Sequence, residues 1–91
     1  MEDFSGKTVI VTGGGRGVGR GVGLAFAVAG ANVMLGARTI SYGEEVKAEI
    51  ISAGGHAECF EADIAKHEDC RALVDATVRA FGGVDVIVHA A

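Results

Sequence analysis

Glycine and arginine are concentrated in one stretch near the start of the chain, T-V-I-V-T-G-G-G-R-G-V-G-R-G-V-G, which runs from Thr8 to Gly23. It begins with a β-branched run, so its glycines should link the end of a strand to the start of a helix. Unpaired N–H groups and the positive end of a helix dipole favour a phosphate at such a place. Glycines also let the phosphate approach the backbone closely. The stretch therefore predicts a site for a phosphate-bearing ligand.

Three glycine signatures could describe this stretch, and spacing distinguishes them. The phosphate-loop pattern G-x-x-x-x-G-K-[ST] fails, because Arg20-Gly21 follow Gly14 and Gly19 in place of Lys and Ser or Thr. The pattern G-x-G-x-x-G fails because no glycine has others at both its second and its fifth following position. The pattern T-G-x-x-x-G-x-G fits from Thr12-Gly13 through Gly17 and Gly19. A mononucleotide kinase is therefore not indicated.

Strand and helix patterns alternate along the chain. β-branched or apolar runs predict strands over Lys7–Thr12, Asn32–Gly36, Ala57–Glu61 and Val84–Ala90. Helical spacing predicts helices over Gly17–Ala29, Ser41–Ala53 and His67–Phe81. Ser41 and Glu44 have the spacing of a capping box at the start of the second helix. The alternation predicts an α/β fold, a Rossmann-type doubly wound parallel sheet with right-handed crossovers.

The apolar residues indicate which surfaces of this fold are buried. Val9–Val11 and Val86–Val88 do not alternate with polar residues, so we expect both faces of these strands to be covered. The third helix has the clearest helical pattern, with Cys70, Leu73, Val74, Thr77, Val78 and Phe81 along one face. The doubly wound order places the fourth strand beside the first, with Val84, Val86 and Val88 on an open apolar edge. A missing C-terminal half or a second copy of the chain could cover that edge.

Composition excludes several classes of partner. Apolar residues make up 49% and charged residues 22% of the 91 residues, which is typical of one globular domain over 1–91. The net charge of -4 argues against general binding to nucleic acid or to an anionic membrane. Gly30 interrupts the uncharged stretch between Arg20 and Arg38, which favours a helix and a buried strand over a membrane span.

The start of the chain and its cysteines predict a cytosolic protein. The acidic beginning, Met1-Glu2-Asp3, lacks the positive charge of a secretory signal. Cys59 and Cys70 have no metal-ligand spacing and are expected to be reduced, packed thiols. We expect no metal site.

The glycine spacing and the order of the elements together resemble the short-chain dehydrogenase/reductase family, whose fingerprint is T-G-x-x-x-G-x-G at this place in the fold. The likeness continues with Ala37-Arg38 after the second strand and Asp63-Ile64 after the third. It extends through F-G-G-V-D-V-I-V-H-A-A at residues 81–91 and so covers the whole chain. The family commonly has N-N-A-G where this sequence has His89-Ala90-Ala91, and a small hydroxyl residue where it has Gly14.

The resemblance implies a set of residues that bind a dinucleotide. It implies that Gly13, Gly17 and Gly19 shape the turn that holds the diphosphate. Asp63 and Ile64 would border the adenine, although Asp63 taken alone is typical of a turn carboxylate. Ala90 would lie near the ribose. The candidate cofactor-binding residues are Gly13, Gly14, Gly15, Arg16, Gly17, Val18, Gly19, Arg38, Asp63, Ile64 and Ala90.

Charge near the adenosine ribose indicates which dinucleotide is bound. An Asp or Glu after the second strand usually holds a free 2'-hydroxyl, whereas a 2'-phosphate calls for Arg. Here the residues are Gly36-Ala37-Arg38, and Arg16 lies in the glycine loop. Each charge-assisted hydrogen bond from these arginines would contribute about 1.5 to 3 kcal/mol. NADP is therefore favoured over NAD.

The residues that catalyse hydride transfer in this family have no counterpart here. The family uses a Tyr acid/base in a Y-x-x-x-K pattern, with a Ser and an Asn, because a phenol must be shifted by a nearby cation to act near neutral pH. Tyr42 is the only tyrosine, it stands at the start of the second helix near the adenosine end, and Val46 lies four positions later. The histidines, His56, His67 and His89, lie in separate connections, and none has a Ser or Cys partner at a spacing that indicates nucleophilic catalysis.

The resemblance implies the function of a longer parent protein. We expect an NADP-dependent oxidoreductase that acts on a small carbonyl or alcohol, with this chain as its cofactor-binding half and the catalytic part absent. A homo-oligomer is expected by the same resemblance. Two alternatives stay open: a dinucleotide-binding module without catalysis, and a self-associating fragment that binds no ligand tightly. The sequence does not indicate the substrate.

Overall fold

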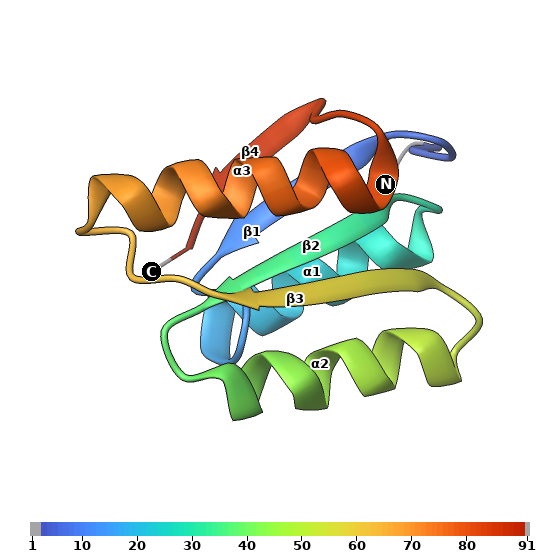
Figure 1. Cartoon of the computed structure of the whole chain (residues 1–91). Coiled ribbons are helices and arrows are strands. Elements are labelled where there is room, and N and C mark those ends of the chain that lie inside the picture. The colour runs from blue at the N-terminus through green and yellow to red at the C-terminus, as the bar shows by residue number, and fades with distance from the viewer. Residues whose placement is uncertain (1–2, 91) are drawn as a thin grey trace.

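The structure, a computed structural model, describes residues 3–90, and the predicted elements are present there in the predicted order. The strands are β1 (Thr8–Thr12), β2 (Asn32–Ala37), β3 (His56–Glu61) and β4 (Val86–His89). The helices are α1 (Gly17–Val28), α2 (Ile40–Ser52) and α3 (His67–Phe81). All strand pairs are parallel, in the order β3-β2-β1-β4 (Figure 1). The Rossmann-type α/β fold is confirmed, as is the place of β4 beside β1.

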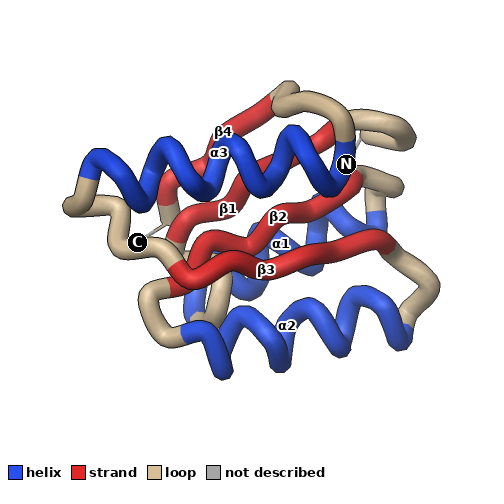
Figure 2. Tube along the Cα trace, in the orientation of Figure 1, coloured by secondary structure: helices blue, strands red, loops and turns tan. Residues whose placement is uncertain are grey.

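The register of the sheet brings the ends of the strands to one edge. Thr12 at the end of β1 pairs with Gly36 on one side and with His89 on the other. Ala37 at the end of β2 pairs with Glu61 at the end of β3. The loops that lead into α1, α2 and α3 therefore begin at the same end of the molecule, on the left in Figures 1 and 2. Residues far apart in the sequence can meet at this carboxyl edge.

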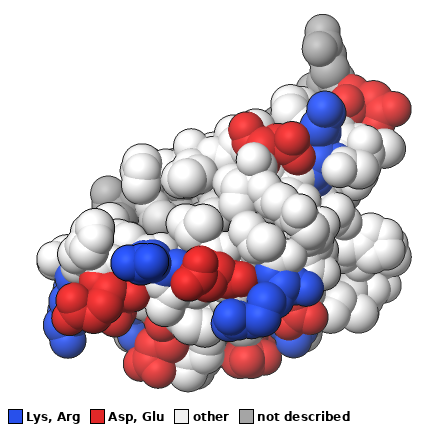
Figure 3. Space-filling model, turned by 45° about the horizontal axis from the view of Figure 1, so that its top comes forward, with Lys and Arg blue, Asp and Glu red and all other residues white. Residues whose placement is uncertain are grey.

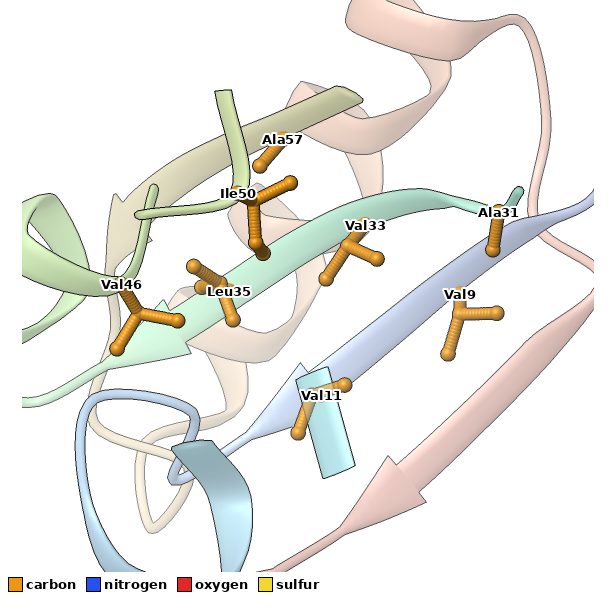
Figure 4. Close-up of a cluster of buried hydrophobic side chains, with 8 residues drawn as sticks. All are labelled: Val9, Val11, Ala31, Val33, Leu35, Val46, Ile50 and Ala57. Atoms are coloured by element: carbon orange, nitrogen blue, oxygen red, sulfur yellow. The ribbon is translucent and has the colours of Figure 1, made fainter. Parts of the chain in front are cut away.

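One face of the sheet packs against α1 and α2. Because side chains alternate between the two faces of a strand, Val9, Val11, Val33 and Leu35 all point to this face. Val46 and Ile50 of α2 complete the cluster with Ala31 and Ala57, as Figure 4 shows. Each buried aliphatic side chain of this size stabilises the fold by about 1.5–3 kcal/mol relative to an exposed one. The main core therefore supports β1 and β2, the strands that carry the glycine turn.

The opposite face packs against α3. Leu73 of α3 is buried in a second cluster with Ile10, Met34 and Ala62. Thr77 is also buried, and its hydroxyl donates to the carbonyl of Leu73 at 2.7 Å. Val74 and Val78, which lie along the same predicted face of the helix, stay 37% and 46% exposed. The apolar stripe of α3 is wider than the surface that the sheet covers.

β4 is less covered than its sequence suggested. β1 is buried along its whole length, as predicted, but Ile87 in β4 is 48% exposed. Ile87 pairs with Ile10, and within residues 3–90 no helix besides α3 lies on that face. The prediction that both faces of β4 are covered is therefore wrong. The outer edge of β4 has no partner strand among the described residues, as predicted.

The predicted capping box of α2 is also wrong. Thr39 takes the extended backbone of an N-cap, with φ -107° and ψ 104°, and its side chain makes no capping hydrogen bond. Ser41 lies inside the first turn. The carboxylate of Glu44 accepts a hydrogen bond from the thiol of Cys59 at 3.1 Å and so ties α2 to β3.

Candidate functional site

A cleft of about 430 Å³ opens at the carboxyl edge of the sheet, between the β1–α1 turn, the start of α2 and the end of β4. Most of the residues predicted to bind a cofactor line it: Gly13, Gly15, Arg16, Gly17, Val18, Arg38 and Ala90. Ala37, Thr39 and Tyr42 complete the lining. The fold thus brings the glycine loop and the residues after β2 to one place.

The β1–α1 turn is held in shape by backbone contacts. The amides of Gly13 and Gly14 donate to the carbonyl of Gly36 in β2, at 2.9 and 3.4 Å. Gly13 has a φ of +69° and Gly17 a φ of +61°, in the left-handed region that residues with a β-carbon rarely adopt. Glycine is therefore required at both positions for the backbone alone.

Within residues 3–90, neither a capping side chain nor a first-turn carboxylate neutralises the N-terminus of α1. Its N-cap is Arg16, whose backbone is extended and whose side chain makes no capping hydrogen bond. The first turn contains no acidic residue. The positive end of the helix dipole and the first N–H groups therefore lie beside Gly17 and Val18, which line the cleft. This arrangement suits an anion.

Hydrogen bonds join the end of β4 to the end of β1. The amide of Ala90 donates to the carbonyl of Thr12 at 3.0 Å. The Thr12 hydroxyl lies 3.4 Å from the carbonyl of Val88, to which it donates, and 3.1 Å from Nδ1 of His89. These contacts place Ala90 in the wall of the cleft. Ala91, the last residue of the H-A-A segment, lies outside the described residues.

Two arginines form the charged side of the cleft. Arg16 and Arg38 are both exposed and both line it. The guanidinium carbon of Arg16 lies 4.6 Å from the centre of the Tyr42 ring, and its Nη1 lies 3.4 Å from the Tyr42 hydroxyl. The sequence placed Tyr42 near this end of the fold but gave no sign of the contact.

Four of the predicted residues lie outside the lining of the cleft. Gly14 in the turn and Gly19 in α1 are both buried. Asp63 and Ile64 lie in the loop after β3, and Ile64 is 39% exposed. Oδ1 of Asp63 accepts a hydrogen bond from the amide of Ala65 at 3.0 Å, which is a turn contact.

A second hollow, of about 670 Å³, lies at the opposite edge of the sheet. It is lined by residues around the C-terminal ends of α1 and α2, including Val28, Gly30, Ala53, Gly54 and His56. Helix C-termini carry partial negative charge, so this hollow is less suited to a phosphate than the cleft.

Reactive groups elsewhere offer little chemistry. Burial, together with the hydrogen bond to Glu44, raises the pKa of the Cys59 thiol to about 11, so the thiol stays protonated at neutral pH.

Within residues 3–90, no three His, Cys, Asp or Glu side chains are grouped as metal ligands would be. Over the same residues, no helix combines the length and apolar character needed to span a bilayer.

Comparison with known proteins gives consistent matches along the chain. The family model for short chain dehydrogenases matches residues 7–91. The chain is 48% identical over 85 residues to the 2,5-dichloro-2,5-cyclohexadiene-1,4-diol dehydrogenase of Sphingobium indicum, covering 93% of this chain and 33% of that protein. It is 42% identical over 90 residues to 3beta-hydroxysteroid dehydrogenase 1 of Eggerthella lenta, covering 97% of this chain and 34% of that protein. The chain therefore spans about a third of the length of these relatives.

Solved structures share the fold. A hydroxysteroid dehydrogenase from Escherichia coli superposes with a TM-score of 0.94 at 33% identity, covering 96% of this chain and 37% of that one. A 7 alpha-hydroxysteroid dehydrogenase, solved in complex with NADH and 7-oxo glycochenodeoxycholic acid, superposes with a TM-score of 0.92 at 33% identity, covering 93% of this chain and 33% of that one.

Proposed function

The chain belongs to the short-chain dehydrogenase family, and from this premise we propose that residues 1–91 form the dinucleotide-binding part of a carbonyl or alcohol oxidoreductase. The bound cofactor would supply a hydride acceptor or donor at its nicotinamide. The groups that assist the transfer would lie outside these residues, because Val46 and not Lys stands four positions after the only tyrosine, Tyr42. We therefore expect the 91-residue chain alone to bind cofactor without reducing a carbonyl.

The single observation that carries this proposal is the uncapped start of α1 at the glycine turn. Gly13 and Gly17 line the cleft with positive φ, and neither a capping side chain nor an acidic residue neutralises the helix N-terminus. A diphosphate placed there would accept hydrogen bonds from backbone amides and interact with the positive end of the helix dipole.

We propose NADP as the preferred dinucleotide. Among the described residues, those that line the cleft include Arg16 and Arg38 but no Asp or Glu. A ribose 2'-hydroxyl is usually held by an acidic side chain, whereas a 2'-phosphate is held by Arg. NAD is the less favoured alternative.

The remaining assignments extend the proposal around the cofactor. Gly14, Gly15, Val18 and Gly19 would shape the turn that holds the diphosphate. Asp63 and Ile64 would border the adenine from the loop after β3, and Ala90 would lie beside a ribose. The net charge of -4 and the free thiols of Cys59 and Cys70 support a cytosolic protein without affinity for nucleic acid or membrane.

Isothermal titration of the 91-residue chain with NADPH and with NADH tests this proposal. Arg38→Ala should weaken NADPH binding about 10- to 100-fold, because one charge-assisted hydrogen bond contributes about 1.5–3 kcal/mol. NADH binding should change by less than about 2-fold, because NADH carries no 2'-phosphate for Arg38 to bind. Arg71→Ala, which removes an exposed arginine of α3, is the matched control and should change neither.

Two results would contradict the proposal. Equal losses of NADPH and NADH affinity in Arg38→Ala would refute the assignment of Arg38 to a 2'-phosphate. No binding of either dinucleotide at millimolar concentration would refute a cofactor site in this chain. The second result would favour the self-associating fragment.

One observation supports self-association as a second property. Ile87 of β4 and Val74 and Val78 of α3 are apolar and exposed, beside an edge strand with no partner among residues 3–90. Figure 3 shows a broad surface without charged side chains, bordered below by a row of charged residues. Such edges pair with other chains. We propose that the 91-residue chain forms a homo-oligomer through β4 of a second copy.

A further inference from the structure

We propose that Tyr42 positions Arg16 at the cleft and thereby strengthens the preference for a dinucleotide that carries a 2'-phosphate. This inference rests on the NADP binding proposed above and adds a residue that the family pattern does not supply. Tyr42 would act through Arg16 and would not touch the reacting atoms.

The first support is the geometry of the contact. The guanidinium carbon of Arg16 stands 4.6 Å from the centre of the Tyr42 ring, within the range of a cation–π interaction. Nη1 of Arg16 also donates to the Tyr42 hydroxyl at 3.4 Å. The ring and the hydroxyl together restrict a long, exposed side chain to one side of the cleft. Both residues line that cleft.

The second support is the contrast with the neighbouring arginine. Arg20, one helical turn later, donates to both carboxylate oxygens of Glu49 in α2 and so forms an ion pair. Arg16 forms no ion pair with any acidic side chain of residues 3–90. An arginine held by an aromatic ring keeps its charge and its remaining N–H donors for an anion. Arg16 is therefore held in place and is still free to bind phosphate.

The third support is the packing that makes the contact possible. A β-carbon on Gly15 would lie 2.5 Å from Cβ of Tyr42 and 3.2 Å from the amide nitrogen of Gly43. The start of α2 approaches the glycine loop as closely as it does because Gly15 has no side chain. One loop glycine thus serves the contact between Tyr42 and Arg16, in addition to any role toward a diphosphate.

The expected effect follows from the cost of ordering a flexible side chain. A free arginine on the surface loses rotamer freedom when it binds an anion, and a side chain that is ordered beforehand loses less. Removal of the ring should therefore weaken binding of a 2'-phosphate about 2- to 10-fold. A ligand without that phosphate should bind as before.

The test uses the 91-residue chain and two probes of the adenosine half-site, 2',5'-ADP and 5'-AMP. Tyr42→Leu should lose about 2- to 10-fold in affinity for 2',5'-ADP and keep its affinity for 5'-AMP. Tyr42→Phe retains the ring and should stay within about 2-fold of the unmodified chain for both probes. Tyr42→Gln, which suits an exposed helical position, replaces Tyr42→Leu if that variant does not fold.

A double mutant separates positioning from a merely structural role. In an Arg16→Ala background, Tyr42→Leu should have no further effect on 2',5'-ADP, because the residue it positions is gone. An equal effect in both backgrounds, an equal loss for both probes, or no loss at all would overturn the inference. A lack of preference for 2',5'-ADP over 5'-AMP in the unmodified chain would instead show that the NADP assignment itself has failed.

Discussion

The carbonyl of Gly13 lies directly against the α-carbon side of Gly19, so that a β-carbon on Gly19 would overlap the carbonyl oxygen and lie 2.5 Å from its carbon. The residue after β1 thus touches the third residue of α1, backbone to backbone. This contact holds the helix N-terminus against the end of the strand. It fixes the position of the turn from which the proposed diphosphate site is built.

Gly19→Ala should therefore destabilise the chain, because the new methyl group meets backbone that cannot move aside. We expect a loss of about 1–3 kcal/mol in the free energy of unfolding, measured by denaturant titration. Gly21→Ala is the matched control, since Gly21 lies in the same helix with open space around it. It should stabilise the chain by up to about 1 kcal/mol through helix propensity. Similar effects of the two substitutions would contradict the backbone contact as the reason for glycine at this position.

The stability of the chain should fall between about pH 9 and pH 11. Burial and the hydrogen bond to Glu44 raise the pKa of Cys59 from 9.0 to about 11 in the folded chain. The folded state then holds the thiol proton more tightly than the unfolded state over this interval, so its contribution is complete below pH 9 and is lost as the pH rises through 11. Cys59→Ser keeps a donor to Glu44 but does not titrate there.

Thermal unfolding at pH 8, 9, 10 and 11 measures this difference. The Tm of the unmodified chain should fall more steeply with pH than that of Cys59→Ser, and parallel curves would refute the pKa assignment. Glu44→Ala removes the hydrogen-bond acceptor and should accelerate alkylation of Cys59 by iodoacetamide at a fixed pH.

Ile87→Lys should reduce self-association of the 91-residue chain. The substitution places a charge at the open edge of β4, which is how natural edge strands avoid pairing. Ile51→Lys is the matched control, because Ile51 is 51% exposed on α2, against 48% for Ile87, and lies away from β4. Sedimentation velocity over a range of concentrations should show a shift toward monomer for Ile87→Lys alone. The same shift in both variants, or in neither, would exclude β4 as the interface.

The sequence predicted the elements well because their signals are local. The β-branched runs at Val9–Val11 and Val86–Val88 and the glycines after each helix mark strands and helix ends without knowledge of the rest of the fold. The wrong predictions concern burial and capping. Ile87 has the apolar side chain of a core residue, yet its burial depends on which elements pack beside it. Ser41 has the spacing of a cap, but Thr39 takes the extended backbone that a cap requires.

The candidate site was predictable to the extent that parallel strands end at the same edge. That rule places Gly13, Arg38 and Ala90 near one another from the order of strands and helices alone. The contact between Arg16 and Tyr42 was not predictable, because it depends on how closely α2 approaches the loop at Gly15. Side-chain contacts between elements of this kind are decided by packing and not by spacing along the chain.

Amide chemical-shift mapping of the ¹⁵N-labelled chain during titration with NADPH tests the proposed diphosphate site most directly. We predict that the largest shifts fall on the amides of the β1–α1 turn, from Gly13 to Gly19, with smaller shifts at Arg38 and Ala90. Shifts confined to the hollow around Gly30 and Gly54 at the opposite edge, or no shifts at saturating NADPH, would contradict that site.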